Sequence, residues 1–539
     1  MRYWADAEVP APAGAVPAYD VEAYLTFVPD FGGWNNVRLS LETALVLARA
    51  SGRVLVLPPV QSYYLLTACK AAEGGCEYSL ADFAPPLLAA RSRARVISSE
   101  EFFAAVLPRL AAEGRLADDV EWPPRKKVTN AAARCTPRHK ATDSCFPLYE
   151  WLDASFVADF VPDTEGGVVI FGKARAQRVF GDDFTEARVA KLRYDPPEWR
   201  RDGLARLWRE PVDGDKELRD NRLARAVVHL RTAGWKTHGA DAKHVDRAGR
   251  LLTPFYAYAA DVDPAANNFY KRLVRDVVRH SDAVTCAAAA IVTWLGRMGG
   301  PAVPGADAAF SSLHARMNEF QFGESGNLAA ETLRDAVGRS LGAREALYVA
   351  TDAPDRATFD AIRHRGHRVV LLSDAILAST RARRNATGPL PLKYAKDWNG
   401  VSMTPAEAAA VAAVGRNEHG LVDVLVAAQG RAFTGTWFST LTTHVQRIRG
   451  YVGRPDESTF FSMATRWAAC QRWEEPRRPW YMREFPTAWR GIAGDDQPGP
   501  RPGEGVYNGP KDGVDYQQKG YPADGAAADP RTRPFPVRR

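Results

Sequence analysis

Residues 24–59 contain, in order, a short apolar strand, a glycine-rich turn, a helix and a second apolar strand. YLTFV at 24–28 combines aromatic and β-branched residues, which favours a strand, and RVLVLPP at 53–59 has the apolar run typical of a buried parallel strand. Between them, apolar residues recur at helical spacing: Val37, Leu41, Ala44, Leu45 and Ala48. These elements form one βαβ unit, so the pattern predicts a parallel α/β sheet.

The same alternation continues along the chain. Further buried strands are expected at 166–172 and 225–230, and the segment 267–296 predicts two consecutive helices at a hinge between domains. Later strands are predicted at 308–317, 346–352, 367–374 and 431–436, with helices at 327–342, 355–366, 420–430 and 437–450. Such lengths suit a doubly wound sheet in each half of the chain. We therefore expect two Rossmann-like domains, 20–285 and 286–470, and a disordered Pro/Gly-rich tail over 490–539.

Charge and cysteine content narrow the class of protein. The net charge of +7 is small for 539 residues, and no basic tract with interleaved aromatics indicates a nucleic-acid binder. Cys69 with Cys76, and Cys135 with Cys145, lie close enough in sequence for local disulfides, which suit a secretory compartment; neither pair has a zinc-ligand spacing. Cys286 lies in an Ala-rich helical run and is expected to be a buried free thiol. No signal peptide or membrane span is visible.

Polar residues lie at the carboxyl ends of two predicted strands, which is where parallel sheets bind ligands. The turn GGWNN, at Gly32, Gly33, Asn35 and Asn36, lets a ligand approach the backbone, and the helix that follows presents free N–H groups to an anion, with Arg38 as a further donor. In the strand 308–317, His314 and Arg316 are two residues apart and so point to one face. A guanidinium there can bind a diphosphate bidentately.

Two later segments add acceptors and hydroxyls. Asp352 ends the strand YVATD, where it can accept hydrogen bonds from a ribose or a base, and Thr436, Ser439 and Thr440 cluster between a strand and a helix as a second phosphate cradle. The four features also have structural interpretations: an Asn-capped helix, a strand-end salt bridge, a helix N-cap and a Ser/Thr capping box.

A second His-x-Arg segment, His229-Leu230-Arg231, precedes the one at Arg316. We prefer the later copy, because only it is followed closely by YVATD and the hydroxyl cluster. His229, Trp235 and Lys236 are then expected to line the cleft on the acceptor side.

The order YLTFVPDFGGWNNVRLSLETALVLARASGRVLVLPP, HARMNEF, YVATD and FTGTWFSTLTTHVQRIRG resembles the GDP-fucose protein O-fucosyltransferase family, with the look of its plant and algal members, from about residue 23 to about 465. The resemblance implies a GT-B-like fold, with two Rossmann-like domains facing a central cleft. It also implies inverting fucose transfer from GDP-fucose to a protein Ser/Thr or glycan hydroxyl, without a metal ion or other cofactor, in the lumen of the Golgi or endoplasmic reticulum. No nucleic-acid partner is expected.

The resemblance also assigns roles to residues. Arg316 would contact the β-phosphate, and Asn35 or Asn36 would lie near the reacting centre. The remaining donor-binding residues would be Gly32, Gly33, Arg38, His314, Asp352, Ser439 and Thr440.

The chain departs from the family pattern at two places. Gly32 stands where some relatives have a catalytic glutamate, and Met-Asn-Glu follows Arg316 in place of a basic-x-Asp segment, which leaves Asp30 and Glu319 as alternative general bases. A transferase of the same fold with another nucleotide sugar, such as a rhamnosyl donor, and a catalytically silent glycan- or protein-binding member are the alternative functions.

Overall fold

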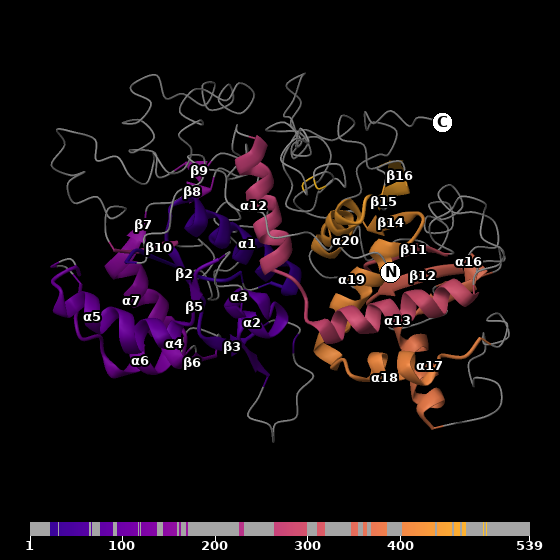
Figure 1. Cartoon of the computed structure of the whole chain (residues 1–539), viewed down its shortest axis with the longest axis horizontal. Helices are drawn as coiled ribbons and strands as arrows, with labels where there is room; N and C mark the ends of the chain where they lie inside the picture. Colours follow the sequence, from indigo (N-terminus) through magenta and orange to yellow (C-terminus); the bar gives the residue numbers. More distant parts are fainter. Residues whose placement is uncertain are drawn as a thin grey trace. The chain divides into compact units, whose positions relative to one another are not determined.

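The computed structural model of the chain contains two parallel sheets with their helices (Figure 1). It describes residues 22–30, 32–63, 66, 76–89, 94–116, 118, 120–136, 144–158, 161–162, 169–170, 226–230, 264–298, 310–317, 346–353, 359–363, 368–384, 401–436, 439–454, 458–463, 466–469, 489 and 492. These residues divide into two units between Arg279 and His280, and Ile492 belongs to the first of them. We call them the N-terminal unit and the C-terminal unit.

The N-terminal unit is built on a parallel sheet with the order β5-β2-β1-β10-β7. Its strands are β1 (Tyr24–Phe27), β2 (Val54–Val56), β5 (Val96–Ile97), β7 (Val157–Ala158) and β10 (Val227–Leu230). A shorter sheet has the order β4-β3-β6, and a further pair joins β8 to β9. These strands are β3 (Val60–Ser62), β4 (Glu77–Tyr78), β6 (Arg134–Cys135), β8 (Val161–Pro162) and β9 (Val169–Ile170).

Nine helical segments of the N-terminal unit are described: α1 (Trp34–Ala50), α2 (Leu80–Phe83), α3 (Pro86–Ala89), α4 (Ser99–Glu101), the π-helical turn η2 (Phe102–Val106), α5 (Leu107–Ala112), α6 (Lys126–Ala133), α7 (Phe146–Phe156) and α12 (Pro264–Val277). Helix α1 is buried along almost its whole length, because it connects β1 to β2 and also contacts α12. The glycine turn that precedes it lies between the end of β1 and the start of this buried helix.

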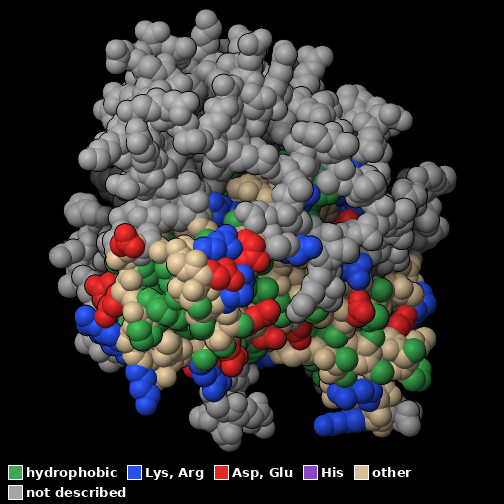
Figure 2. Space-filling view, turned by 60° about the vertical axis from the view of Figure 1, so that its left-hand side comes forward, with side chains coloured by type: hydrophobic (Ala, Val, Ile, Leu, Met, Phe, Trp, Pro, Cys, Tyr) green, Lys and Arg blue, Asp and Glu red, His purple; other side chains and the backbone are tan. Residues whose placement is uncertain are grey.

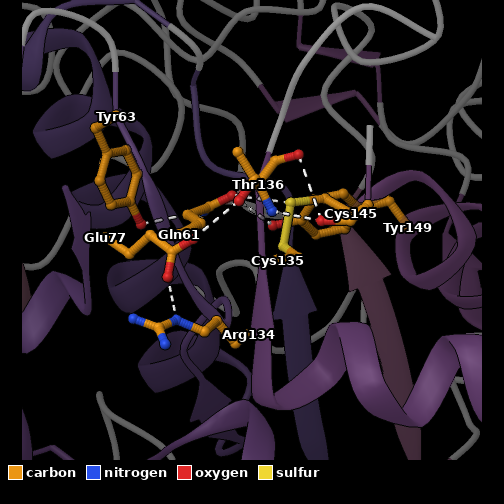
Figure 3. The surroundings of a disulfide bond; sticks show 9 residues. Gln61, Tyr63, Glu77, Arg134, Cys135, Thr136, Cys145 and Tyr149 are labelled. Carbon is orange, nitrogen blue, oxygen red and sulfur yellow. Dashed lines mark hydrogen bonds and ion pairs between the residues drawn. A yellow bond between two sulfur atoms is a disulfide. The ribbon is translucent and has the colours of Figure 1, made fainter. Parts of the chain in front are cut away.

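A disulfide ties the small sheet to α7 (Figure 3). Cys135 of β6 and Cys145, just before α7, are both buried and are bonded to each other. Around them, Glu77 pairs with Arg134 and accepts a hydrogen bond from the Thr136 hydroxyl at 2.9 Å. The predicted Cys135–Cys145 disulfide is confirmed; Cys76 is disulfide-bonded as well, whereas Cys69 lies outside the described residues.

The C-terminal unit contains a six-stranded sheet with the order β13-β12-β11-β14-β15-β16, parallel except for the last pair. Its strands are β11 (Phe310–Ala315), β12 (Ala346–Thr351), β13 (Arg368–Leu371), β14 (Phe433–Thr436), β15 (Thr459–Met463) and β16 (Arg466–Ala469). The two central strands are buried throughout, as expected for a sheet with helices on its faces.

Helices of the C-terminal unit surround this sheet. They are α13 (Asp282–Met298), α16 (Asp360–Arg363), α17 (Leu372–Arg383), α18 (Pro405–Ala412), the 3₁₀ turn η11 (Arg416–Glu418), α19 (His419–Gln429) and α20 (Thr440–Tyr451). Helix α19 packs on β11 and β12, and it also contacts α13 and α20. On the lower side of the view, α13, α17 and α18 gather into one group (Figure 1).

The prediction of an α/β fold with parallel sheets is confirmed. Of the strand expected at 166–172, the described residues are Val169–Ile170; they form β9, which pairs antiparallel with β8. Two expectations need correction. Cys286 is a free thiol but is exposed, because its side chain lies on the outer face of α13. Ile492, within the predicted tail, is buried, and its carbonyl accepts a hydrogen bond from Arg272 at 2.7 Å.

The other parts of the predicted tail and the predicted helix at 327–342 lie outside the described residues. None of the described helices is both long and apolar enough to cross a membrane. On the face of the molecule in Figure 2, acidic and basic side chains alternate over the surface. Ion pairs in the N-terminal unit include Arg109 with Glu22 and Arg125 with Glu121.

Candidate functional site

The strand order of the C-terminal unit reverses beside β11. From β11 the chain adds β12 and β13 on one side of the sheet and then crosses to β14 on the other side. In open α/β sheets, ligands bind at the carboxyl ends of the strands at such a reversal. His314 and Arg316 lie at that end of β11, and Thr436 is the last residue of β14.

Two threonine hydroxyls fix the end of β11. The Thr436 hydroxyl accepts a hydrogen bond from the Arg316 backbone N–H at 2.9 Å and donates one to the His314 carbonyl at 2.9 Å. The Thr442 hydroxyl, in α20, donates to the Thr436 carbonyl at 2.9 Å and lies 2.7 Å from Nδ1 of His314. The end of β11 is therefore held to β14 and α20 by side chains as well as by the sheet.

Arg316 forms an ion pair with Asp352, the residue that follows β12. One guanidinium nitrogen lies 3.0 Å from Oδ2 of Asp352, and the two side chains are 27% and 25% exposed. The other carboxylate oxygen accepts a hydrogen bond from the Met317 backbone N–H at 2.7 Å. The guanidinium is thus oriented at the sheet edge and remains open to solvent. Both the predicted salt bridge and a ligand role for Arg316 are compatible with this geometry.

His314 is neutral at physiological pH. Burial, and after it the positive charge of Arg316, lower the pKa of His314 to about 3 from an ordinary value of 6.5. A neutral imidazole has one N–H donor and one acceptor nitrogen, so His314 can orient a ligand but adds no positive charge for a phosphate.

Ser439 and Thr440 begin α20 beside this strand end. Ser439 occupies the N-cap position, yet its side chain makes no capping hydrogen bond, in contrast to the expected Ser/Thr capping box. Gly435 in β14 lies opposite His314 in the sheet, and a Cβ there would be 2.2 Å from the Thr442 methyl group. Glycine at 435 therefore allows α20 to approach β14 closely.

The predicted glycine turn lies at the other sheet, in the N-terminal unit. Gly33 is the N-cap of α1, so Asn35 and Asn36 lie in the first helical turn and do not cap the helix as one interpretation expected. Asp30 is buried and accepts a hydrogen bond from the Gly32 backbone N–H at 2.7 Å, which folds the turn. All four predicted turn residues therefore gather at the start of one long helix.

Arg38 lies inside the N-terminal unit. Its side chain is 1% exposed and pairs with Glu42, one helical turn further along α1. His229, from the second His-x-Arg segment, is buried on β10, where Nδ1 lies 2.8 Å from the Thr26 hydroxyl of β1. Arg231, Trp235, Lys236 and Glu319 lie outside the described residues.

The structure thus brings together His314, Arg316 and Asp352 with Ser439 and Thr440 at one sheet edge, and gathers the glycine-turn residues at another. Sequence reasoning missed Thr442, whose hydroxyl contacts His314. The only signal for it is its place in the Ser/Thr-rich start of α20. No group of three His, Cys, Asp or Glu side chains suited to a metal ion is present in the described ranges.

The site thus belongs to an α/β protein with charged and hydroxyl side chains at the carboxyl ends of a parallel sheet, where proteins of this class bind ligands. The GDP-fucose protein O-fucosyltransferase family model matches residues 24–452, and the chain belongs to this family of glycosyltransferases. The predicted family and enzyme class are confirmed.

Solved fucosyltransferase structures are also similar to this chain. POFUT1 in its apo form is 13% identical with a TM-score of 0.37, and the match covers 83% of this chain and 99% of that one. POFUT1 in complex with GDP-fucose is 14% identical with a TM-score of 0.33 and the same coverage. NodZ from Bradyrhizobium is 12% identical with a TM-score of 0.27, covering 79% and 93%. No curated protein matches significantly.

Proposed function

We propose that this protein transfers fucose from GDP-fucose to a hydroxyl group of a protein or glycan. Family membership supports the donor, and POFUT1 has been solved with GDP-fucose bound. The proposal includes a GT-B-like arrangement of two Rossmann-like domains, 20–285 and 286–470, facing a central cleft, and an inverting reaction without a metal ion.

The observation that carries this proposal is the position of Arg316. It lies at the carboxyl end of β11, where the strand order reverses, and its guanidinium is oriented but partly exposed. Such a group can bind a diphosphate through two hydrogen bonds and stabilise the charge that develops on the leaving GDP. The start of α20, with Ser439 and Thr440, adds N–H and hydroxyl donors for the same phosphates.

An inverting transfer needs a base that takes the proton of the acceptor hydroxyl. Asp30 and Glu319 are the two candidates. Asp30 has one carboxylate oxygen bonded to Gly32 N–H, and the glycine turn that it folds also contains Asn35 and Asn36, the proposed neighbours of the reacting centre.

We also propose that the protein works in the lumen of the Golgi or endoplasmic reticulum. The disulfide between Cys135 and Cys145 supports an oxidising compartment, because such bonds are rare in the reducing cytosol.

The test is fucose transfer and GDP-fucose hydrolysis by the wild type, Arg316→Ala and Arg316→Lys. We expect Arg316→Ala to lower kcat by about 100-fold or more, as for the loss of a group that stabilises transition-state charge, and Arg316→Lys to restore part of it. Arg297→Ala is the matched control, because Arg297 pairs with Glu407 on α18, away from the strand ends. Equal turnover by Arg316→Ala and the wild type would remove the proposed role. Stabilisation by UDP but not by GDP would refute the donor.

A further inference from the structure

The hydrogens at the end of β11 can be counted. A threonine hydroxyl has one hydrogen and two lone pairs, and a neutral histidine has one ring N–H. The Thr436 hydroxyl donates its hydrogen to the His314 carbonyl and accepts a hydrogen bond from the Arg316 N–H. The Thr442 hydroxyl has two neighbours, the Thr436 carbonyl at 2.9 Å and His314 Nδ1 at 2.7 Å.

Only one tautomer of His314 satisfies both neighbours of Thr442. The carbonyl of Thr436 can only accept, so it takes the hydrogen of the Thr442 hydroxyl. His314 must then donate from Nδ1 to the Thr442 oxygen. With the hydrogen on Nε2 instead, the single hydroxyl hydrogen of Thr442 would serve two acceptors, and one of the two bonds would be lost.

Packing prevents Thr442 from turning away. Its methyl group and hydroxyl lie 2.2 Å and 2.7 Å from the place that a Cβ of Gly435 would occupy, so the side chain fills the space above the glycine backbone. Thr442 is 2% exposed and His314 is 3% exposed. The pair is therefore closely packed and lies away from competing water.

We propose that Thr442 is a positioning residue that holds His314 with its hydrogen on Nδ1, so that Nε2 can only accept a hydrogen bond from the bound ligand. This inference rests on the proposed function, because it takes the ligand to be the nucleotide sugar held by Arg316. His314 lies near the end of β11 and Arg316 follows that strand, and the positive charge of Arg316 acts on the imidazole, so a ligand on the guanidinium comes within reach of His314.

The two side chains then sort the ligand's atoms by chemistry. An ionised phosphate oxygen carries no hydrogen and pairs with Arg316. Nε2 of His314 instead accepts a hydrogen bond from a ligand group that carries a hydrogen, which is a hydroxyl or an N–H. In a nucleotide sugar such groups are the sugar hydroxyls and the amino or imino groups of the base. The pair would therefore fix the direction in which the donor lies along the strand ends.

The tautomer can be measured in the full chain without ligand. Long-range ¹H–¹⁵N spectra of protein labelled at its 10 histidines distinguish a protonated from a bare ring nitrogen, and His314→Gln assigns the signal. We expect a protonated Nδ1 and a bare Nε2 in the wild type and in Thr442→Ser, and a mixture of tautomers in Thr442→Val. A wild-type His314 with its hydrogen on Nε2 would overturn the proposal.

The ligand group is identified by binding. Dissociation constants are measured for GDP, 2′-deoxy-GDP, 3′-deoxy-GDP, inosine diphosphate and GDP-fucose. Loss of the group that donates to Nε2 weakens binding by about 2- to 10-fold, the worth of one hydrogen bond. The deoxy nucleotides report a ribose hydroxyl, inosine diphosphate reports the base amino group, and the ratio of GDP-fucose to GDP reports a fucose hydroxyl. Each comparison gives a ratio of two dissociation constants, and we expect one of these ratios to fall towards one in Thr442→Val.

Thr380→Val is the matched control. Thr380 lies in α17, is half-buried and donates to the Ile376 carbonyl at 3.0 Å, so the same substitution removes a hydroxyl remote from His314. It should leave the tautomer and all the ratios as in the wild type. Ratios that are identical in the wild type and Thr442→Val would refute the proposal. If Thr442→Val does not fold, the spectra of the wild type and Thr442→Ser still decide it. A wild type that binds no GDP would refute the proposed function, and the spectrum without ligand would still report the role of Thr442.

Discussion

Gly435 is a position at which α20 packs tightly on the sheet of the C-terminal unit, and Gly435→Ala tests that packing. A Cβ at 435 would lie 2.2 Å from the Thr442 methyl group, 2.7 Å from its hydroxyl and 2.9 Å from a ring carbon of Phe433. Carbon atoms pack at about 3.5–4.0 Å, so the methyl contact is more than 1 Å too short. Because Thr442 is β-branched and bonded to His314, it cannot rotate away at low cost.

We expect Gly435→Ala to lower the free energy of unfolding by roughly 1–3 kcal/mol, the usual cost of an extra methyl group in a packed core. For a unit of this size that corresponds to a fall in Tm of roughly 2–12 °C. The same variant should displace Thr442 and hence weaken nucleotide binding. If the substitution changed only the backbone conformation at position 435, nucleotide binding would be unchanged.

Gly296→Ala is the matched control. Gly296 lies in α13, and a Cβ there would have no atom within 4 Å. The same substitution should therefore stabilise the chain by about 0.5–1 kcal/mol, because alanine loses less conformational entropy than glycine in a helix. Urea unfolding followed by tryptophan fluorescence measures both variants in the full chain. Equal effects of the two substitutions would contradict the packing argument.

A second substitution separates the clash from other causes. Thr442→Ala alone should cost about 1–3 kcal/mol, because it deprives His314 Nδ1 and the Thr436 carbonyl of their partner. In the presence of Gly435→Ala it should cost less, since it also removes the two atoms that clash. Additivity of the two substitutions within about 0.5 kcal/mol would refute a direct contact between them.

Three further predictions concern single residues. Thr436→Val should destabilise the chain by about 2 kcal/mol and weaken GDP binding in a titration, because it leaves Arg316 N–H and the His314 carbonyl without their partner. Burial raises the pKa of Asp423 to about 7 from 3.8, so the folded state binds a proton that the unfolded state lacks, and this stability is lost as the pH rises through 7. Urea unfolding should therefore show that the free energy of unfolding of the wild type rises relative to that of Asp423→Asn as the pH falls from 7 to 5. The rise should be at most about 1.4 kcal/mol per pH unit, since Asp423 is partly exposed. Asp30→Asn keeps an oxygen for the Gly32 N–H, so a turnover loss of about 100-fold with unchanged stability would identify the base, and unchanged turnover would exclude it.

The sheets were predictable because their signals are local. Alternating strands and helices of suitable length mark β1, α1 and β2, and the same pattern recurs from β11 to α20. The region between 60 and 165 had no such periodicity, and its three-stranded sheet is assembled from two- and three-residue strands far apart in sequence. Ile492 was not predicted to be ordered for a similar reason, since its carbonyl bonds to Arg272, 220 residues earlier in the chain.

The residues of the candidate site likewise fall into those that local sequence predicts and those that depend on the strand order. Strand alternation alone puts His314 and Arg316 on one face of β11, and the ion pair of Arg316 with Asp352 follows from the neighbouring strands of a parallel sheet. Thr442 could not be found in this way, because β14 joins β11 only after the chain has passed through β12 and β13 and crossed the sheet. Charged side chains at strand ends are visible in a sequence, whereas the hydroxyl that sets the hydrogen of a histidine becomes visible only with the topology. Substitutions at Thr442 therefore test a contact that depends on the strand order: how this chain orients the acceptor nitrogen of His314 beside Arg316.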